Sequence, residues 1–127
     1  MGTPTQVVTA FLAEWAKSEE ALYQSLRDYF SADAIWENVG VATTKGPEEG
    51  VAFLQGFFKD FSVGKMLVDM IHIAAAGNAV LTERVDRLID SDGKELFGIR
   101  IMGVFEVRDN KITAWRDYFD TASLAAG

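Results

Sequence analysis

The first half of the chain carries apolar residues at the spacing that is typical of helices. Thr3, Pro4 and Gln6 have the form of a capping box with proline in the first turn, which predicts that a helix begins there. Ser18 predicts the start of a second helix, and the Gly46-Pro47 pair predicts the start of a third. The positions that these helices would bury are Val7, Val8, Phe11, Leu12, Trp15, Leu22, Leu26, Tyr29, Phe30, Val51, Leu54, Phe57 and Phe58.

The rest of the chain is typical of strands separated by short turns. A short strand is predicted at 34–39, and four long strands at 65–75, 79–89, 95–107 and 111–120. Glycine, asparagine and aspartate between the long strands favour tight reversals, so these strands should form an antiparallel meander. The sequence therefore predicts an α+β protein in which helices cover one face of a curved sheet. Such a sheet leaves an apolar hollow between the two layers, where small ligands bind.

Composition narrows the class of partner. The chain has 127 residues, 49% of them hydrophobic, and no linker-like stretch, so residues 1–127 should form a single domain. A net charge of −7 disfavours binding to nucleic acid or to anionic membranes. The chain has no cysteine and one histidine, which argues against thiolate catalysis and against the usual zinc sites. We expect a small neutral ligand, no metal and no cofactor.

Targeting signals are also missing from the pattern. The N-terminal residues lack the basic start and apolar stretch of a signal peptide, and no apolar run approaches the roughly 20 residues of a membrane span. We expect a soluble protein with no membrane partner. The lack of cysteine fits a reducing compartment, so a cytoplasmic location is the prediction.

Charged residues occur on strand faces that are otherwise apolar. Residues two apart share a face, so Arg84 and Asp86 lie with Val80, Thr82 and Leu88. By the same alternation, one face carries Thr113, Trp115, Asp117 and Phe119, and another carries Ala34, Trp36 and Asn38.

If all three faces point inward, the hollow contains two carboxylates, one guanidinium and one amide. Burying such ions costs several kcal/mol unless they pair well. Arg84, Asp86 and Asp117 together carry one negative charge, and burial favours uptake of one proton. One carboxyl group would then be an acid and the other a base at the same pH, as proton-transfer chemistry requires.

A second interpretation of the same residues needs no function. Arg84 and Asp86 are two apart on a strand and would also fit an ordinary exposed ion pair of little energetic value. Asp117 would then face water beside Arg116.

Two stretches carry a family resemblance. The first runs from His72 to Asp86 and contains Thr82-Glu83-Arg84-Val85-Asp86, and the second runs from Gly103 to Asp120 and contains Trp115-Arg116-Asp117-Tyr118-Phe119-Asp120. With these motifs the chain resembles the limonene-1,2-epoxide hydrolase family, and the likeness extends over nearly the whole chain. It implies the cone-shaped sheet with helices that this family shares with nuclear transport factor 2 and ketosteroid isomerase.

The resemblance also implies a reaction and a set of roles. The enzyme would add water to an epoxide in one step, without a covalent ester or a cofactor. Asp86 would protonate the epoxide oxygen, Asp117 would take a proton from water, Arg84 would bridge the two carboxylates, and Asn38 would help to hold the water. A homodimer is usual among such proteins and is expected here.

Trp36 departs from the family pattern, which commonly has a tyrosine two residues before the asparagine. A hydroxyl can accept a proton from water, whereas an indole N–H can only donate. Trp36 is therefore predicted to be a wall of the pocket, with its N–H available for a contact. The predicted substrate-binding residues are Trp36, Phe57, Phe61, Val63, Leu88, Ile99, Ile101 and Phe119, which together favour an apolar terpene, cycloalkene or aryl epoxide.

Other functions and residues stay open at this point. A ketosteroid-isomerase-like or polyketide-cyclase-like enzyme would need one carboxylate base facing an oxyanion donor, and a non-catalytic binding or dimerisation module would need neither. His72 is given no role, because a lone histidine is more often structural. Gly98 and Gly103 indicate close packing or a bend, and Glu37 should face outward.

Overall fold

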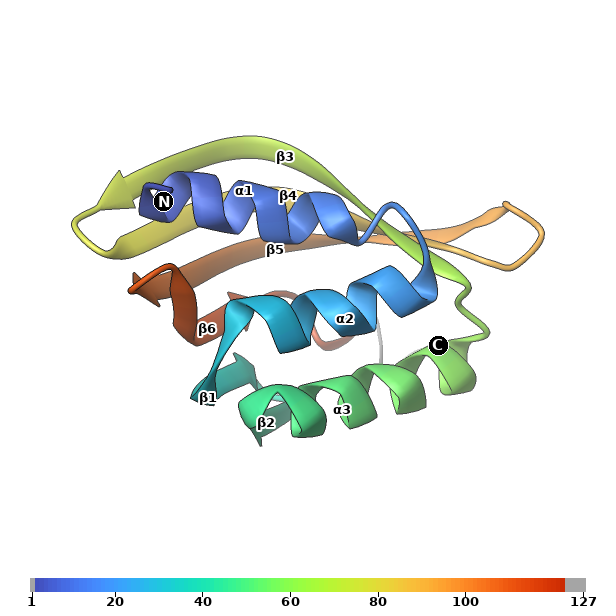
Figure 1. Ribbon diagram of the computed structural model, residues 1–127. Coiled ribbons are helices and arrows are strands. Elements are labelled where there is room, and N and C mark those ends of the chain that lie inside the picture. Colours follow the sequence, from blue (N-terminus) through green and yellow to red (C-terminus); the bar gives the residue numbers. More distant parts are fainter. Residues whose placement is uncertain (1, 123–127) are drawn as a thin grey trace.

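A six-stranded sheet carries three helices on one face in the part of the chain that the structure describes, residues 2–122 (Figure 1). The structure is a computed structural model. The elements follow in the order α1 (Pro4–Glu14), α2 (Glu19–Tyr29), β1 (Phe30–Asn38), β2 (Ala42–Lys45), α3 (Gly46–Phe61), β3 (Lys65–Ala76), β4 (Ala79–Ile89), β5 (Glu95–Arg108) and β6 (Lys111–Tyr118). None of these helices is long and apolar enough to cross a membrane.

The helix ends follow from the residues that the sequence analysis singled out. Thr3 Oγ1 accepts a hydrogen bond from the backbone N of Gln6 at 3.2 Å, and Gln6 Oε1 accepts one from the backbone N of Thr3 at 2.9 Å. Ser18 Oγ accepts from the backbone N of Ala21 at 3.0 Å and so caps α2. α3 ends at Phe61, and its C-cap residue Ser62 has a left-handed φ of 56°. The predicted helix starts are confirmed.

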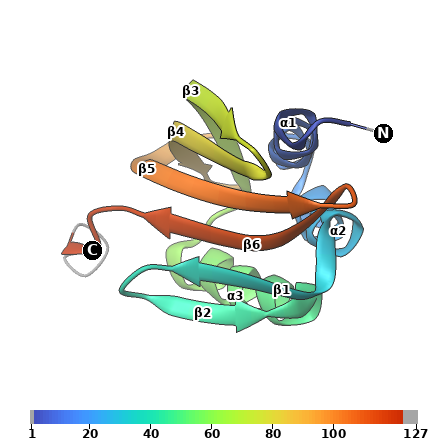
Figure 2. The same cartoon turned by 90° about the vertical axis from the view of Figure 1, so that its left-hand side faces the viewer.

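The sheet order is β2-β1-β6-β5-β4-β3. Strands β3 to β6 pair as consecutive antiparallel neighbours, which confirms the predicted meander. β1 then joins the sheet in parallel beside β6, and Figure 2 shows the arrows of these two strands pointing the same way. The sheet is therefore mixed, and the parallel pair brings residues of the first half of the chain beside the last strand.

Two local predictions need correction. Phe30 was expected on the second helix, but its φ of −78° and ψ of 139° are extended, and it is the first residue of β1. The side chain is buried in either case, which is why the helical pattern included it. β2 was not predicted at all. It is a four-residue edge strand that pairs only with β1, so its sequence has no long alternating pattern.

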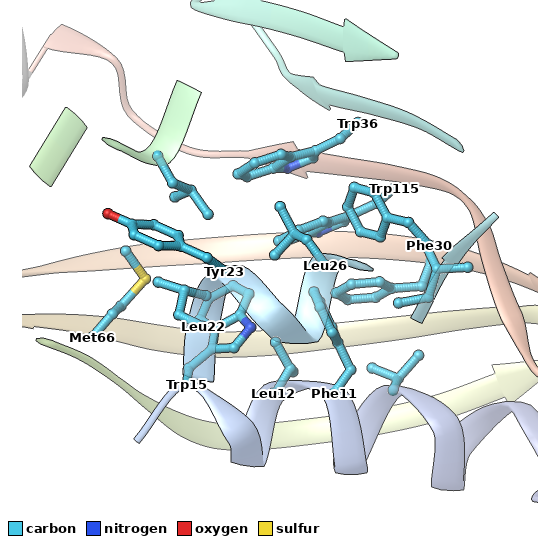
Figure 3. Close-up of a cluster of buried hydrophobic side chains, with 14 of the residues drawn as sticks. Phe11, Leu12, Trp15, Leu22, Tyr23, Leu26, Phe30, Trp36, Met66 and Trp115 are labelled. Carbon is cyan, nitrogen blue, oxygen red and sulfur yellow. The ribbon is translucent and has the colours of Figure 1, made fainter. Parts of the chain in front are cut away.

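Aromatic side chains fill the space between the helices and the sheet (Figure 3). Trp36 of β1 and Trp115 of β6 are stacked, with ring centroids 4.4 Å apart and an interplanar angle of 6°. Phe105 stacks on Trp115, with ring centroids 4.9 Å apart. Phe11 of α1 and Trp15, the C-cap residue of α1, also contact the Trp115 ring. These large rings form a dry wall beside the charged residues described next.

Candidate functional site

Three charged side chains lie on the helix-facing side of the sheet. Arg84 and Asp86 come from β4 and Asp117 comes from β6, with exposed fractions of 0%, 4% and 2%. Their neighbours on the same faces, Val80, Thr82, Leu88 and Trp115, are buried as well. The predicted alternation is confirmed, and the interpretation as an exposed ion pair is wrong.

The guanidinium of Arg84 connects the two carboxylates. Its Nε donates to Asp86 Oδ1 at 2.9 Å, and its Nη2 donates to Asp86 Oδ2 at 3.3 Å and to Asp117 Oδ2 at 2.6 Å. Its Nη1 donates to Thr82 Oγ1 at 3.0 Å, and that hydroxyl donates to the carbonyl oxygen of Gly103 at 3.0 Å. The rings of Phe105 and Trp115 lie 5.7 and 5.8 Å from the guanidinium carbon, close enough for cation–π attraction.

Gly103 makes this connection possible. β5 lies between β4 and β6, and Gly103 is the β5 residue that pairs with both Thr82 and Asp117. A Cβ atom on Gly103 would collide with Arg84 Nη1 and Asp117 Oδ1. The missing side chain therefore lets the guanidinium cross over β5, which confirms the predicted close packing at this glycine.

Asp117 is held at both carboxylate oxygens. Oδ2 accepts from Arg84, and Oδ1 accepts from the indole Nε1 of Trp115 at 2.7 Å. From the sequence, Trp115 was predicted only as an apolar residue of the inner face. Its spacing of two residues from Asp117 on a strand was the available signal, because side chains two apart share a face and lie within reach of each other.

Burial sets the protonation of the cluster. It raises the pKa of Asp86 to about 6; the Arg84 guanidinium opposes this rise and the Asp117 carboxylate adds to it. Burial alone would lower the pKa of Arg84, but the carboxylates of Asp117 and Asp86 raise it above its usual value. A charged Arg84 and one proton held by the carboxyl pair make a neutral cluster, which is the state that a dry site favours.

A small cavity of about 50 Å³ adjoins the two carboxylates. Its lining residues are Trp15, Trp36, Asn38, Phe53, Leu54, Phe57, Met66, Asp86, Ile99, Ile101, Asp117 and Phe119. Carboxylate, amide and indole groups are thus the polar parts of an otherwise apolar wall. This combination suits a mostly apolar ligand that reacts at one polar point.

The predicted substrate-binding residues, together with Asn38, fall into three groups. Those that line the cavity are Trp36, Asn38, Phe57, Ile99, Ile101 and Phe119. Val63 and Leu88 lie instead in the hydrophobic core, and Phe61 lines a groove on the surface. That groove also contains Phe53 and Phe57, so these two rings separate the cavity from the outside. The cavity residues that were not predicted are Trp15, Phe53, Leu54 and Met66. The first three come from the helical layer and Met66 from the start of β3, and the pattern of a single strand face does not show which residues of other elements meet it.

The remaining titratable residues form no second centre in residues 2–122. His72 lies outside the cavity with its side chain 80% exposed, and its Nδ1 is 2.9 Å from Glu83 Oε1. The described part of the chain contains no group of three His, Cys, Asp or Glu side chains that could hold a metal ion. Glu37 is half-buried on the outer side of β1.

Comparison with known proteins agrees with this geometry. A family model described as the limonene-1,2-epoxide hydrolase catalytic domain matches residues 2–127. The chain belongs to the limonene-1,2-epoxide hydrolase family. The Arg84, Asp86 and Asp117 cluster is therefore the charged centre of a limonene-1,2-epoxide hydrolase family domain, and the resemblance inferred from the two motifs is confirmed.

Individual relatives point the same way. Epoxide hydrolase EphG of Mycobacterium tuberculosis is 40% identical over 95 residues, which are 75% of this chain and 60% of that protein. The chain thus spans about 60% of the length of that curated relative. A solved M. tuberculosis LEH-like epoxide hydrolase is 32% identical with a TM-score of 0.76, over 97% of this chain and 82% of the other.

The fold is shared more widely than the family. A putative SnoaL-like polyketide cyclase from Jannaschia has a TM-score of 0.78 over 97% of this chain and 89% of its own, at 13% identity. An NTF2-like protein from Burkholderia pseudomallei has a TM-score of 0.79 over 99% of this chain and 97% of its own, at 15% identity. These likenesses confirm the predicted α+β, nuclear transport factor 2-like class.

The substitution Gly103→Ala tests whether the Arg84 guanidinium needs the open space at Gly103 to cross over β5 to Asp117. We expect it to lower the free energy of unfolding by about 1–3 kcal/mol, because the new methyl group needs the space of two buried, hydrogen-bonded groups. Urea denaturation measures the change. Gly98→Ala is the control on the same strand, since its Cβ would meet the Val85 Cγ1 methyl at 3.0 Å and Arg87 Cγ at 3.9 Å, both on side chains that can shift, and should cost less than about 0.5 kcal/mol. Equal losses in the two variants would contradict this role for Gly103.

Proposed function

We propose that this chain adds water to an apolar epoxide of the terpene, cycloalkene or aryl type and yields a vicinal diol in one step. The observation that carries the proposal is the pair of buried carboxyl groups on one guanidinium, next to an apolar cavity. The pKa of about 6 for Asp86 supports the presence of an acid beside a base near neutral pH. Family membership supports the same reaction.

Each carboxyl group has one role in the proposed step. Protonated Asp86 gives its proton to the epoxide oxygen while the carbon–oxygen bond of the ring breaks. Asp117 takes a proton from a water molecule whose oxygen forms the new bond to carbon. The step consumes no net proton, because Asp86 loses one proton and Asp117 gains one. One proton must then return from Asp117 to Asp86 before the next turnover. Strain in the epoxide ring assists its opening, so two positioned proton carriers suffice without a cofactor.

Neighbouring residues would hold the reactants. Arg84 contacts both carboxyl groups and so fixes their separation. Asn38 pairs with Asp117 across β1 and β6, which supports its role beside the water. Trp36, Phe57, Ile99, Ile101 and Phe119 would surround the substrate, whereas Val63 and Leu88 would support the wall from the core.

The size of the cavity bears on how a substrate would enter. About 50 Å³ holds a few water molecules at roughly 10–15 Å³ each, but not a terpene epoxide. Phe53 and Phe57 are half-buried and lie between the cavity and the surface groove that Phe61 also lines. Rotation of these two rings toward the groove is the proposed way to admit the substrate.

The alternatives fit the site less well. An isomerase or cyclase on this fold is compatible with the SnoaL-like neighbour, but it would use one carboxylate and a separate oxyanion donor. Here Arg84 binds two carboxylates at once, an arrangement that differs from one carboxylate base facing a separate oxyanion donor. A binding module would give no reason to bury an acid and a base within reach of the same guanidinium.

Amide variants of the two acids test the assigned roles. Asp117→Asn removes the base and Asp86→Asn removes the acid, and each should lower kcat for limonene oxide or cyclohexene oxide by at least about 100-fold. Diol formation followed by gas chromatography is the measurement. Glu83→Gln is the control, because this half-buried β4 carboxylate lies outside the cavity and should keep full activity. Full activity in either Asp variant would rule out its role.

The acid role also fixes the direction of the pH dependence. Since the pKa of Asp86 is raised to about 6, the proton that it donates is present below this pH and is lost as the pH rises through it. We expect kcat/KM to fall with increasing pH above about 6, by roughly tenfold per unit once Asp86 is ionised. A profile measured from pH 5 to pH 8 that stays level would contradict Asp86 as the acid.

We further propose that the protein is a homodimer that uses the outer face of the sheet. Ile71, Leu81, Met102 and Tyr118 are exposed there, and Met102 and Tyr118 are cross-strand neighbours. Sedimentation equilibrium should give about twice the chain mass of 14.0 kDa, and Met102→Lys should shift the protein to the monomer. A monomeric wild-type protein at micromolar concentration would end this proposal.

The cytoplasmic location remains a prediction that rests on the absence of cysteine.

A further inference from the structure

The indole N–H of Trp36 is a buried donor without a hydrogen-bond partner in the described residues 2–122. The residue is 3% exposed, and it lines the cavity together with Asn38 and Asp117. Trp115, which stacks on it, has by contrast satisfied its own N–H on Asp117. A buried N–H without an acceptor costs about 1–3 kcal/mol, so its position in a cavity wall points to an acceptor supplied from the cavity.

The packing around Trp36 fixes the direction of that N–H. A Cβ atom on Gly50 would lie 3.5 Å from Cε3 of Trp36, in the same place where it meets Leu26 and Phe30. Cε3 and Nε1 are on opposite long edges of an indole ring. The Cε3 edge faces the Phe30 end of β1, so the N–H edge faces the other end of the strand, where Asn38 lies.

The neighbouring strand supports the same direction. Trp36 pairs with Trp115 and Asn38 pairs with Asp117 across the parallel strands β1 and β6. The two indole planes differ by only 6°. The N–H of Trp115 reaches forward along β6 to Asp117, and the Trp36 N–H, turned the same way along β1 by the contact of its Cε3 edge near Gly50, reaches the level of Asn38. This is the part of the cavity beside the Asp117 carboxylate.

The inference rests on the proposed function: we propose that the Trp36 N–H donates a hydrogen bond to the water molecule that attacks the epoxide. That water has two protons and two lone pairs to place. The Asp117 carboxylate and the Asn38 side-chain oxygen accept its two protons, and the Trp36 N–H occupies one lone pair. One lone pair remains, and it is directed at the epoxide carbon. Trp36 thus becomes a third residue that orients the nucleophile, with a donor in place of a hydroxyl.

Kinetics of Trp36→Phe test this role, since phenylalanine keeps an aromatic ring and removes the donor. We expect kcat to fall about tenfold while KM changes less than threefold, because the lost hydrogen bond orients water rather than substrate. Phe30→Leu is the control for packing: this buried ring also contacts Trp36 and Trp115 but does not line the cavity. Its kcat should stay within about twofold of wild type. Equal losses of kcat in the two variants would overturn the proposal.

A high-resolution crystal structure of the wild-type protein gives a readout that does not depend on activity or on a variant that folds. We expect a water molecule within about 2.7–3.2 Å of Trp36 Nε1, Asn38 Oδ1 and an Asp117 carboxylate oxygen. A water held by Asn38 and Asp117 but out of reach of Nε1 would overturn the inference. If the three-point water is present and no epoxide is hydrolysed, the water site stands and the proposed reaction fails.

Discussion

The guanidinium of Arg84 occupies a fully buried position between two carboxylates, and the arrangement of the site depends on it. An ion in such a place is tolerated only when its charge and its hydrogen bonds are met by the surroundings. Asp86, Asp117 and Thr82 meet them directly. Removing one partner from a buried ion pair, here either carboxylate, typically costs about 3–5 kcal/mol, so the three charged groups act as one unit.

This unit explains why chemistry-bearing residues are found so deep in a small domain. The stacked rings of Trp36, Trp115 and Phe105 exclude water from one side of the cluster, and the same dryness raises the pKa of Asp86 to about 6. A carboxyl group that faced solvent would ionise near its usual pKa of 3.8 and could not serve as an acid near neutral pH. The aromatic core therefore stabilises the fold and also sets the protonation of the site.

Strand alternation made much of the site predictable from sequence. Each of the three charged residues, Arg84, Asp86 and Asp117, interrupts an apolar strand face. Side chains alternate with a period of two, so this assignment does not depend on exactly where a strand begins or ends. The four long strands and the three helix starts were predicted for similar local reasons.

The features that were not predicted from the sequence depend on pairing between strands that lie far apart along the chain. The role of Gly103 follows from its position opposite both Thr82 and Asp117, and no single-strand pattern contains that register. The parallel pairing of β1 with β6 is also non-local, and it is what brings Trp36 and Asn38 beside Trp115 and Asp117. Leu88 was assigned to the pocket because the inner face of a strand does not distinguish a cavity wall from the core behind it, and Val63, between α3 and β3, also lies in that core.

The most direct test of the buried, proton-sharing cluster is a carbon-13 NMR titration of the aspartate side-chain carboxyl groups, with Asp86→Asn identifying the Asp86 signal. We expect Asp86 to change its protonation with a midpoint near pH 6 in the substrate-free protein. A midpoint near 3.8, the value of an ordinary exposed aspartate, would contradict it.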